Sequence, residues 1–165
     1  PASIATKELG RWIEHSGEPN AIEQWVTSLG ETYSLIILDV APAMDALTQS
    51  IMMAVDRIYL PLIPTPLSMN AYETVVDYMR GVNAKSKRIR PFFSMVDRRK
   101  KLHCDFLETP PIKLRKQMEG FIPYSSDVEK MGIHRQPIYM FAPRSPAAEA
   151  YQQMWEQMAS QLWKV

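Results

Sequence analysis

The residue best placed for chemistry is Asp39, which directly follows four aliphatic residues, Leu35–Leu38, and stands shortly before Pro42. In open parallel sheets, ligands bind beyond the carboxyl ends of the strands. A carboxylate at such a position can hold a magnesium ion through water or orient an attacking water molecule. The same acid can also cap a helix or complete a turn. From this local pattern alone, the structural interpretation is the better one.

The densest run of charge is Arg98, Arg99, Lys100 and Lys101, with His103 close behind. Four adjacent cations can contact several phosphates and give salt-dependent nucleic-acid affinity that does not depend on base sequence. A solvated surface loop is the ordinary interpretation of such a run. A second basic stretch, whose position is less informative, contains Lys85, Lys87, Arg88 and Arg90.

Bulk composition excludes few classes of protein. The chain has 165 residues, 46% of them hydrophobic and 22% charged, which is ordinary for a globular domain with a substantial core. A disordered or fibrous protein is therefore excluded. Because the net charge is only +1, any nucleic-acid surface has to come from a local cluster of cations.

Several kinds of site and segment are missing from the sequence. Cys104 is the only cysteine, so no intramolecular disulfide can form, which suits a reducing cytosol. The longest apolar runs are too short to cross a bilayer, and no signal-peptide pattern is present. The three histidines show no metal-ligand spacing with one another or with the cysteine, and no G-x-S-x-G motif occurs.

The elements that must position these residues alternate along the chain. Continuous apolar runs predict buried strands at residues 33–40, 57–63, 89–96 and 120–123. Helical spacing predicts helices at residues 21–29, 45–55, 68–79, 105–118, 126–131 and 145–163, with Ser68 as the N-cap of the third. Pro110 and Pro111 must break or start the fourth. This alternation predicts βαβ units around a mostly parallel sheet, in one α/β domain that covers residues 1–165.

Five segments follow one another in a recognisable order: YSLIILDVAP, AVDRIYLPLIPTP, FFSMVDRR, FIPYSSDVEKMGIHRQPI and FAPRSPAAEAYQQM. They resemble the ParA/MinD family of deviant-Walker P-loop ATPases. That family shows an aliphatic strand ending in D-x-P-P, an A-D-x-hydrophobic strand ending in proline, an I-P strand end, a K-P-I-like turn and a P-x-S-x-x-A-E-x-Y helix start. The resemblance runs from about Tyr33 to the C-terminus. It implies a three-layer, Rossmann-like P-loop NTPase fold.

The resemblance also implies roles for five residues. Asp39 and Pro42 match a switch-like segment in which the acid acts in catalysis, near the hydrolytic water and, through water, near Mg²⁺. Met95 and Asp97 match positions that line the adenine pocket, and Pro123 matches the turn where the backbone closes over the base. Plain core packing for Met95 and a simple strand end at Pro123 are the alternatives.

The family's phosphate-binding loop, K-G-G-x-x-K-[ST], has no counterpart in the sequence. The 6 glycines, at positions 10, 17, 30, 81, 120 and 132, form no such loop, and only 38 residues precede Asp39. Amides and lysines of that loop hold the phosphates. We therefore expect a fragment that lacks the N-terminal strand and the phosphate loop. Such a fragment would not bind ATP and Mg²⁺ tightly or hydrolyse ATP alone.

The resemblance implies a parent protein that partitions or positions DNA or other large cargo in the cytoplasm, associated with the nucleoid. ATP would drive homodimerisation and nonspecific DNA binding through Arg98–Lys101, and a ParB-like or other stimulating partner would reset the cycle. One departure is that Tyr124–Asp127 lacks the arginines that partitioning members often carry after I-P.

Two alternatives accompany this expectation. A MinD-like protein would need a cationic amphipathic membrane helix, but the last predicted helix has mainly Gln and Glu on its polar face. Core packing therefore explains its apolar stripe better, and we expect no membrane contact; the stripe includes Tyr151, Trp155, Met158 and Leu162. The other alternative is a non-catalytic interaction module that keeps the ParA-like fold.

Overall fold

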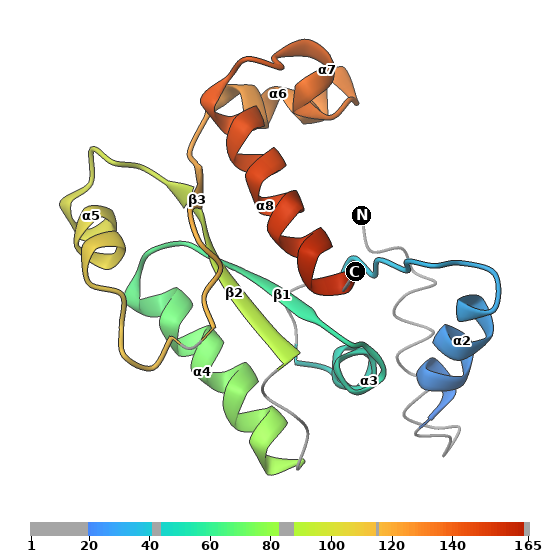
Figure 1. Ribbon diagram of the computed structural model, residues 1–165. Helices are drawn as coiled ribbons and strands as arrows, with labels where there is room; N and C mark the ends of the chain where they lie inside the picture. The colour runs from blue at the N-terminus through green and yellow to red at the C-terminus, as the bar shows by residue number, and fades with distance from the viewer. Residues whose placement is uncertain (1–19, 41–43, 83–87, 115, 164–165) are drawn as a thin grey trace. The chain divides into compact units, whose positions relative to one another are not determined.

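The computed structural model describes residues 20–40, 44–82, 88–114 and 116–163 (Figure 1). The chain divides into two compact units, Pro1–Ile58 and Tyr59–Val165. The expectation of one domain over residues 1–165 stays a prediction.

Two helices form the described core of the first unit. Helix α2 covers Ala21–Gly30 and helix α3 covers Ala46–Ala54, so the helices predicted at 21–29 and 45–55 are confirmed. Asp45 caps α3, because its carboxylate accepts a hydrogen bond of 2.8 Å from the Thr48 N–H. The two helices pack through one apolar cluster, formed by Ile22, Val26, Leu47, Ile51 and Ala54.

The buried strand predicted at residues 33–40 is wrong. This segment has no strand structure, and the Ile37 side chain is 74% exposed. A strand needs partners for its backbone N–H and C=O groups. The described residues of the first unit form no other strand that could provide them. The apolar run therefore gave a wrong strand prediction, because hydrophobicity alone does not supply a pairing partner.

The second unit contains a three-stranded, all-parallel open sheet. Its strands are β1 (Ile58–Leu62), β2 (Ile89–Val96) and β3 (Phe121–Pro123), in the order β1-β2-β3. The strands predicted at 57–63, 89–96 and 120–123 are confirmed. This α/β arrangement is compatible with a Rossmann-like layout. Since β1 lies at an edge of the sheet, it tolerates Pro61, which lacks a backbone N–H.

Helix α4 connects β1 to β2 and covers Pro66–Gly81. Its N-cap is Thr65, not Ser68, because the Thr65 hydroxyl accepts a hydrogen bond from the Ser68 N–H. Helix α5 covers Lys101–Glu108, so the prediction of a helix at 105–118 is wrong. The proline pair after Thr109 explains its early end, since a residue before proline avoids helical backbone angles.

Three helices follow β3: α6 (Ser126–His134), α7 (Ile138–Phe141) and α8 (Pro146–Leu162). Two of them confirm predicted helices, whereas the single turn of α7 was not predicted. Within the described ranges, no helix combines the length and apolar character that crossing a membrane requires.

Helices α4 and α8 lie on opposite sides of the sheet (Figure 1). Successive residues of a strand point to opposite faces, and β2 uses both. Phe93 is fully buried and meets Phe106 of α5 edge to face, with ring centroids 6.3 Å apart. Phe92 joins the cluster beneath α8, whose members are Tyr59, Met118, Ile122, Ala150, Met154 and Met158.

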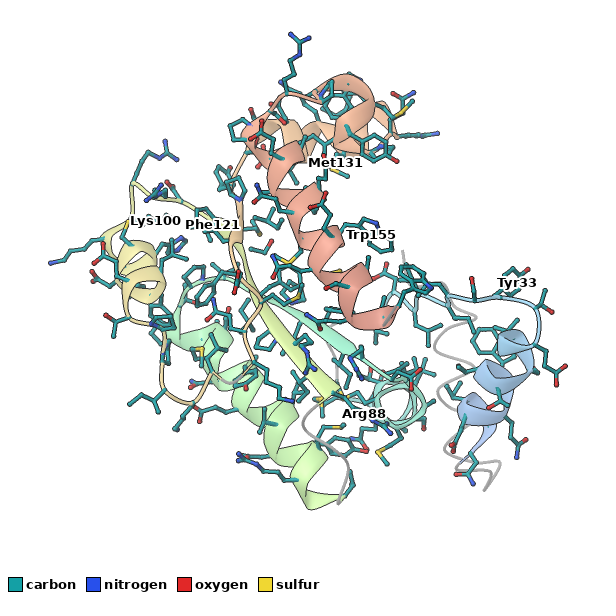
Figure 2. The ribbon with its side chains drawn as sticks, in the orientation of Figure 1. Tyr33, Arg88, Lys100, Phe121, Met131 and Trp155 are labelled. Atoms are coloured by element: carbon teal, nitrogen blue, oxygen red, sulfur yellow. The ribbon has the colours of Figure 1, made fainter. Side chains whose placement is uncertain are left out.

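The apolar stripe predicted for the last helix is partly wrong. Tyr151 is 38% exposed and Trp155, labelled in Figure 2, is 45% exposed. The side that packs inward instead follows Ala147, Ala150, Met154 and Met158, at helical spacing. Small and flexible side chains thus face the sheet and the neighbouring helices.

Helix α8 also binds the backbone just before β3. The Gln157 side-chain amide donates to the Glu119 C=O and accepts from the Glu119 N–H, both at 2.9 Å. One residue earlier, the Met118 N–H donates to the Pro91 C=O of β2 at 2.9 Å. The start of β3 is therefore fixed from two sides.

The pairing of β2 with β3 contains a β-bulge. Phe93 pairs with Phe121 and Val96 with Pro123, so β2 advances one residue more than β3 between the two pairs. Met95 absorbs this extra residue with a φ of 55°, in the left-handed region. Its side chain is 50% exposed. Bulges of this kind redirect a side chain, and here the redirected residue is a predicted site residue.

We predict that the stability of Met95 variants depends on how well each residue tolerates the positive φ at this position. Met95→Gly should be more stable than Met95→Val by roughly 1–3 kcal/mol, because a β-branched side chain is strained at positive φ. Urea unfolding measures the difference. Ser94→Gly and Ser94→Val are the matched control, where valine should be the more stable variant because glycine weakens a regular strand position. Equal tolerance of valine at both positions would contradict the bulge.

Candidate functional site

The candidate site lies where β2 and β3 end side by side. The Tyr124 N–H donates to the Val96 C=O at 2.9 Å, directly after the Val96–Pro123 pair. Because parallel strands end at the same edge of a sheet, Met95 and Asp97 flank Val96 opposite Pro123. Three of the predicted site residues are therefore brought together.

Asp97 organises the turn that follows β2. Its carboxylate accepts a hydrogen bond of 3.1 Å from the Arg99 N–H, which is an Asx turn, and its C=O accepts one of 3.0 Å from the Lys100 N–H. The Arg99 guanidinium binds the same carboxylate with two hydrogen bonds, 2.8 Å to Oδ1 and 2.9 Å to Oδ2. The Asp97 side chain is only 13% exposed.

This pairing sets the charge of Asp97. The hydrogen bonds from the Arg99 side chain, followed by those from its backbone, lower the pKa of the Asp97 carboxyl from 3.8 to about 2. Asp97 in turn raises the pKa of Arg99. Since the folded-state pKa lies below the unfolded value, the pair stabilises the fold fully above about pH 4 and loses that effect as the pH falls towards 2.

His103 supports the turn from the first turn of α5. Its imidazole is 2% exposed, and its Nδ1 atom accepts a hydrogen bond of 3.0 Å from the Asp97 N–H. An imidazole nitrogen that accepts carries no proton, so this geometry requires the neutral ring with its proton on Nε2. The backbone adds a second link, because the His103 N–H donates to the Lys100 C=O at 3.0 Å.

We call Arg98–Lys101 the basic loop; Figure 2 labels Lys100 beside α5. Arg99 is held by Asp97, whereas Arg98, Lys100 and Lys101 are exposed and form no ion pair with any described residue. The Arg98 C=O accepts a hydrogen bond of 3.2 Å from the Cys104 thiol. All four predicted DNA-contacting cations are therefore exposed, but Arg99 is paired with Asp97, whereas the other three form no ion pair with a described residue.

Sequence reasoning missed the roles of two residues at this site, His103 and Tyr124. No spacing rule links His103 to the Asp97 amide. Tyr124 is 48% exposed beside Pro123, and its hydroxyl donates to Glu129 Oε1 at 2.9 Å. That hydrogen bond to Glu129 raises the pKa of Tyr124. An aromatic residue directly after the I-P strand end was the signal that could have drawn attention to it.

The other two predicted site residues, Asp39 and Pro42, are not among the described residues of the second unit. Asp39 belongs to the first unit and is exposed in the irregular segment described above, so it does not end a strand. Pro42 lies outside the described residues. Across the described ranges, no group of three or more His, Cys, Asp or Glu side chains could hold a metal ion. The roles of Asp39 in catalysis and near Mg²⁺ stay predictions.

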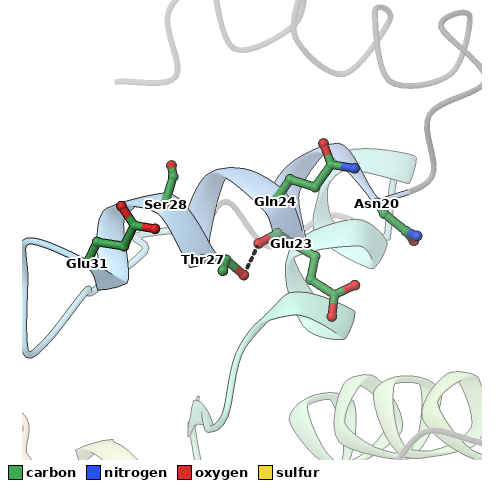
Figure 3. Close-up of a pocket in the computed structure, with 6 residues that line it drawn as sticks. All are labelled: Asn20, Glu23, Gln24, Thr27, Ser28 and Glu31. Carbon is green, nitrogen blue, oxygen red and sulfur yellow. Dashed lines mark hydrogen bonds between the residues drawn. The ribbon is translucent and has the colours of Figure 1, made fainter.

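Two shallow hollows among the described residues share no lining residue with this site. One follows a single polar face of α2, where the Thr27 hydroxyl donates to the Glu23 C=O at 2.8 Å (Figure 3). The other lies between the start of β3 and α8, next to the Gln157 contact with Glu119. Both are lined by polar side chains that face solvent along a helix, and neither brings together groups for catalysis.

A scan against known protein families found no match, and a search of curated proteins found none either. The assignment of this site therefore depends on its residues and geometry.

We predict that Arg99 controls the ionisation of Asp97. Arg99→Gln should raise the pKa of the Asp97 carboxyl from about 2 towards 3.8, because the two guanidinium hydrogen bonds are lost. Arg98→Gln removes the same charge one residue away and should leave this pKa low. Carbon-13 NMR of the carboxyl group during an acid titration measures both. An equal rise in the two variants would show that general positive charge, and not the direct pair, lowers the pKa.

Proposed function

We propose that this chain contributes the base end of the nucleotide site and the DNA-contacting loop of a ParA-like ATPase. The observation that supports the proposal is the Val96–Pro123 pair, followed by the Tyr124–Val96 hydrogen bond. These contacts bring together Met95, Asp97 and Pro123, which the family resemblance assigns to one adenine pocket.

The exposed side chains at this edge of the sheet suit contact with the adenine base of a nucleotide. The bulge turns the flexible thioether of Met95 outward, and the half-exposed ring of Tyr124 follows Pro123. Sulfur and aromatic groups pack well against a flat heteroaromatic ring. Asp97 is committed to Arg99, so in this proposal its role is to hold the turn beneath the base.

The residues present fit the base better than the phosphates and Mg²⁺. The sequence contains no glycine-rich loop, and the described residues offer no cluster of acidic groups for a metal ion. The proposal assigns phosphate binding to a loop of the K-G-G-x-x-K-[ST] type, which these 165 residues do not contain.

In the proposed cycle, ATP promotes a homodimer that binds DNA without sequence preference, and a ParB-like partner returns it to the free state. The basic loop supplies the DNA contact, because Arg98, Lys100 and Lys101 keep their charges available to phosphates. The result would be partitioning or positioning of DNA or another large cargo on the nucleoid.

A non-catalytic interaction module with the same fold is the second candidate function. The missing phosphate-loop motif is the observation that favours it. The sequence of the encoding gene upstream of the Pro1 codon separates the two. A phosphate-loop motif in the same reading frame supports the ATPase, and a start codon at that point supports the interaction module.

We predict that adenine nucleotides perturb Met95. In protein carrying ¹³C-methyl methionine, ATP should shift the Met95 methyl signal with weak, millimolar affinity, because only the base is held. The methyl signal that disappears in Met95→Leu is assigned to Met95. Met140, which is 62% exposed on α7, is the internal control and should not move. Titration with GTP tests the preference for adenine.

The base-end proposal is contradicted if Met95 stays unmoved at ATP concentrations well into the millimolar range. Equal shifts at Met95 and Met140 would contradict it too, because they would indicate a general effect of the added salt.

We predict that the basic loop dominates DNA binding. Lys100→Gln with Lys101→Gln should reduce the slope of log K against log salt concentration by roughly 2, since each lost phosphate contact contributes about 0.9. Arg135→Gln with Arg144→Gln removes the same charge from exposed positions around α7 and should leave the slope almost unchanged. Fluorescence anisotropy with a mixed-sequence duplex measures both. An equal decrease of the slope in the two double variants would show that the basic loop has no special role in DNA binding.

A further inference from the structure

We propose that His103 is a proton-sensitive positioning residue for the basic loop: its neutral imidazole holds the loop in place, and protonation releases it. What the loop binds rests on the proposed function, but the hydrogen bond that holds it does not.

The contact closes the loop at its base. Asp97 provides the first backbone N–H after β2, and His103 lies in the first turn of α5. The 3.0 Å hydrogen bond between the Asp97 N–H and His103 Nδ1 therefore joins the two ends of the segment that carries Arg98–Lys101. Because the ring is buried, water has little access with which to replace this acceptor.

Protonation turns this attraction into a clash of donors. An imidazolium carries hydrogen on both nitrogens, so Nδ1–H would face the Asp97 N–H with no acceptor between them. The Asp97 amide would lose its acceptor at a largely enclosed position, and the ring would have to move. Histidine is the side chain whose charge most readily changes near neutral pH.

Asp97, whose N–H binds the ring, already has its carboxylate occupied by both guanidinium hydrogen bonds of Arg99. From the sheet, β2 packs against α5 through Phe93 and Phe106 and adds no titratable side chain after Arg90. The charged and titratable groups of the surrounding segments are Asp97, Arg98 and Arg99 in the loop, Lys100, Lys101, Cys104 and Asp105 around α5, and Tyr124 after β3.

The test measures exchange of the Asp97 amide with solvent by nitrogen-15 NMR, corrected for the intrinsic rate at each pH. Protection should fall at least about tenfold between roughly pH 7.5 and 5.0 as the imidazole protonates, the scale set by one hydrogen bond to a buried group. The Tyr124 amide, which donates to Val96, is the internal reference and should keep its protection.

Two variants separate the acceptor from the titration. His103→Asn places a side-chain oxygen near the position of Nδ1 that accepts at every pH, so protection of Asp97 should stay constant. His103→Leu fills the space without an acceptor, so protection should be low at both pH values. His134→Asn is the matched control at an exposed histidine on α6, whose ring packs against Phe141, and it should behave as the original protein.

The inference is overturned if the ring signals of His103 report protonation while protection of Asp97 stays constant. A parallel loss of protection in His103→Asn would overturn it equally. If His103→Leu does not fold, the ring signals of the original protein and the His103→Asn variant still decide the inference. DNA binding at both pH values is measured separately. Its absence, with the pH-dependent protection intact, would count against the proposed function and leave the role of His103 standing.

Discussion

The parallel pairing of β2 with β3 is the constraint on which the candidate site depends. Two strands that run in the same direction present their carboxyl ends at one edge, so whatever follows each strand must meet there. The Tyr124–Val96 hydrogen bond extends this pairing one step beyond β3. Because β3 has only three residues, the Met118 and Gln157 contacts at its start are needed to fix which residues face each other.

Beyond the strand ends, Asp97 determines what the basic loop can do. Its N–H, C=O and carboxylate each have a partner, in His103, Lys100 and Arg99 respectively. A loop of four consecutive cations repels itself, and this set of hydrogen bonds offsets that repulsion by neutralising one of them. Arg98, Lys100 and Lys101 are left on a backbone that is already ordered. Ordering before binding reduces the entropy lost when a ligand is bound.

The sequence predicts the regular elements of the second unit well, because their signals are local. The apolar run of residues 89–96 and the short run ending at Pro123 both mark strands that the structure contains. The failures have two physical causes: some features depended on a distant partner, and one helix is broken by neighbouring prolines. Residues 33–40 have the composition of a buried strand without a strand beside them. The helix expected at residues 105–118 ends at the proline pair, and the inward side of α8 is set by what it packs against.

At the candidate site too, some features could be predicted from the sequence and others could not. The resemblance selected Met95, Asp97 and Pro123, which the fold does bring together. It could not show that a bulge turns Met95 outward, because a left-handed φ at a non-glycine residue leaves no mark in sequence pattern. His103 was equally hidden, since its partner is a backbone amide, and backbone amides carry no side-chain identity that a motif could record.

The Gln157 side chain has an effect that reaches beyond one molecule. An unpaired strand at a sheet edge offers donors and acceptors on which other chains can assemble into larger aggregates. At β3, Gln157 already occupies both backbone groups of Glu119, and Pro123 has no N–H to offer. The chain just before β3 and the last residue of β3 therefore offer fewer free backbone groups to another chain, and the three-residue length of β3 limits such pairing further.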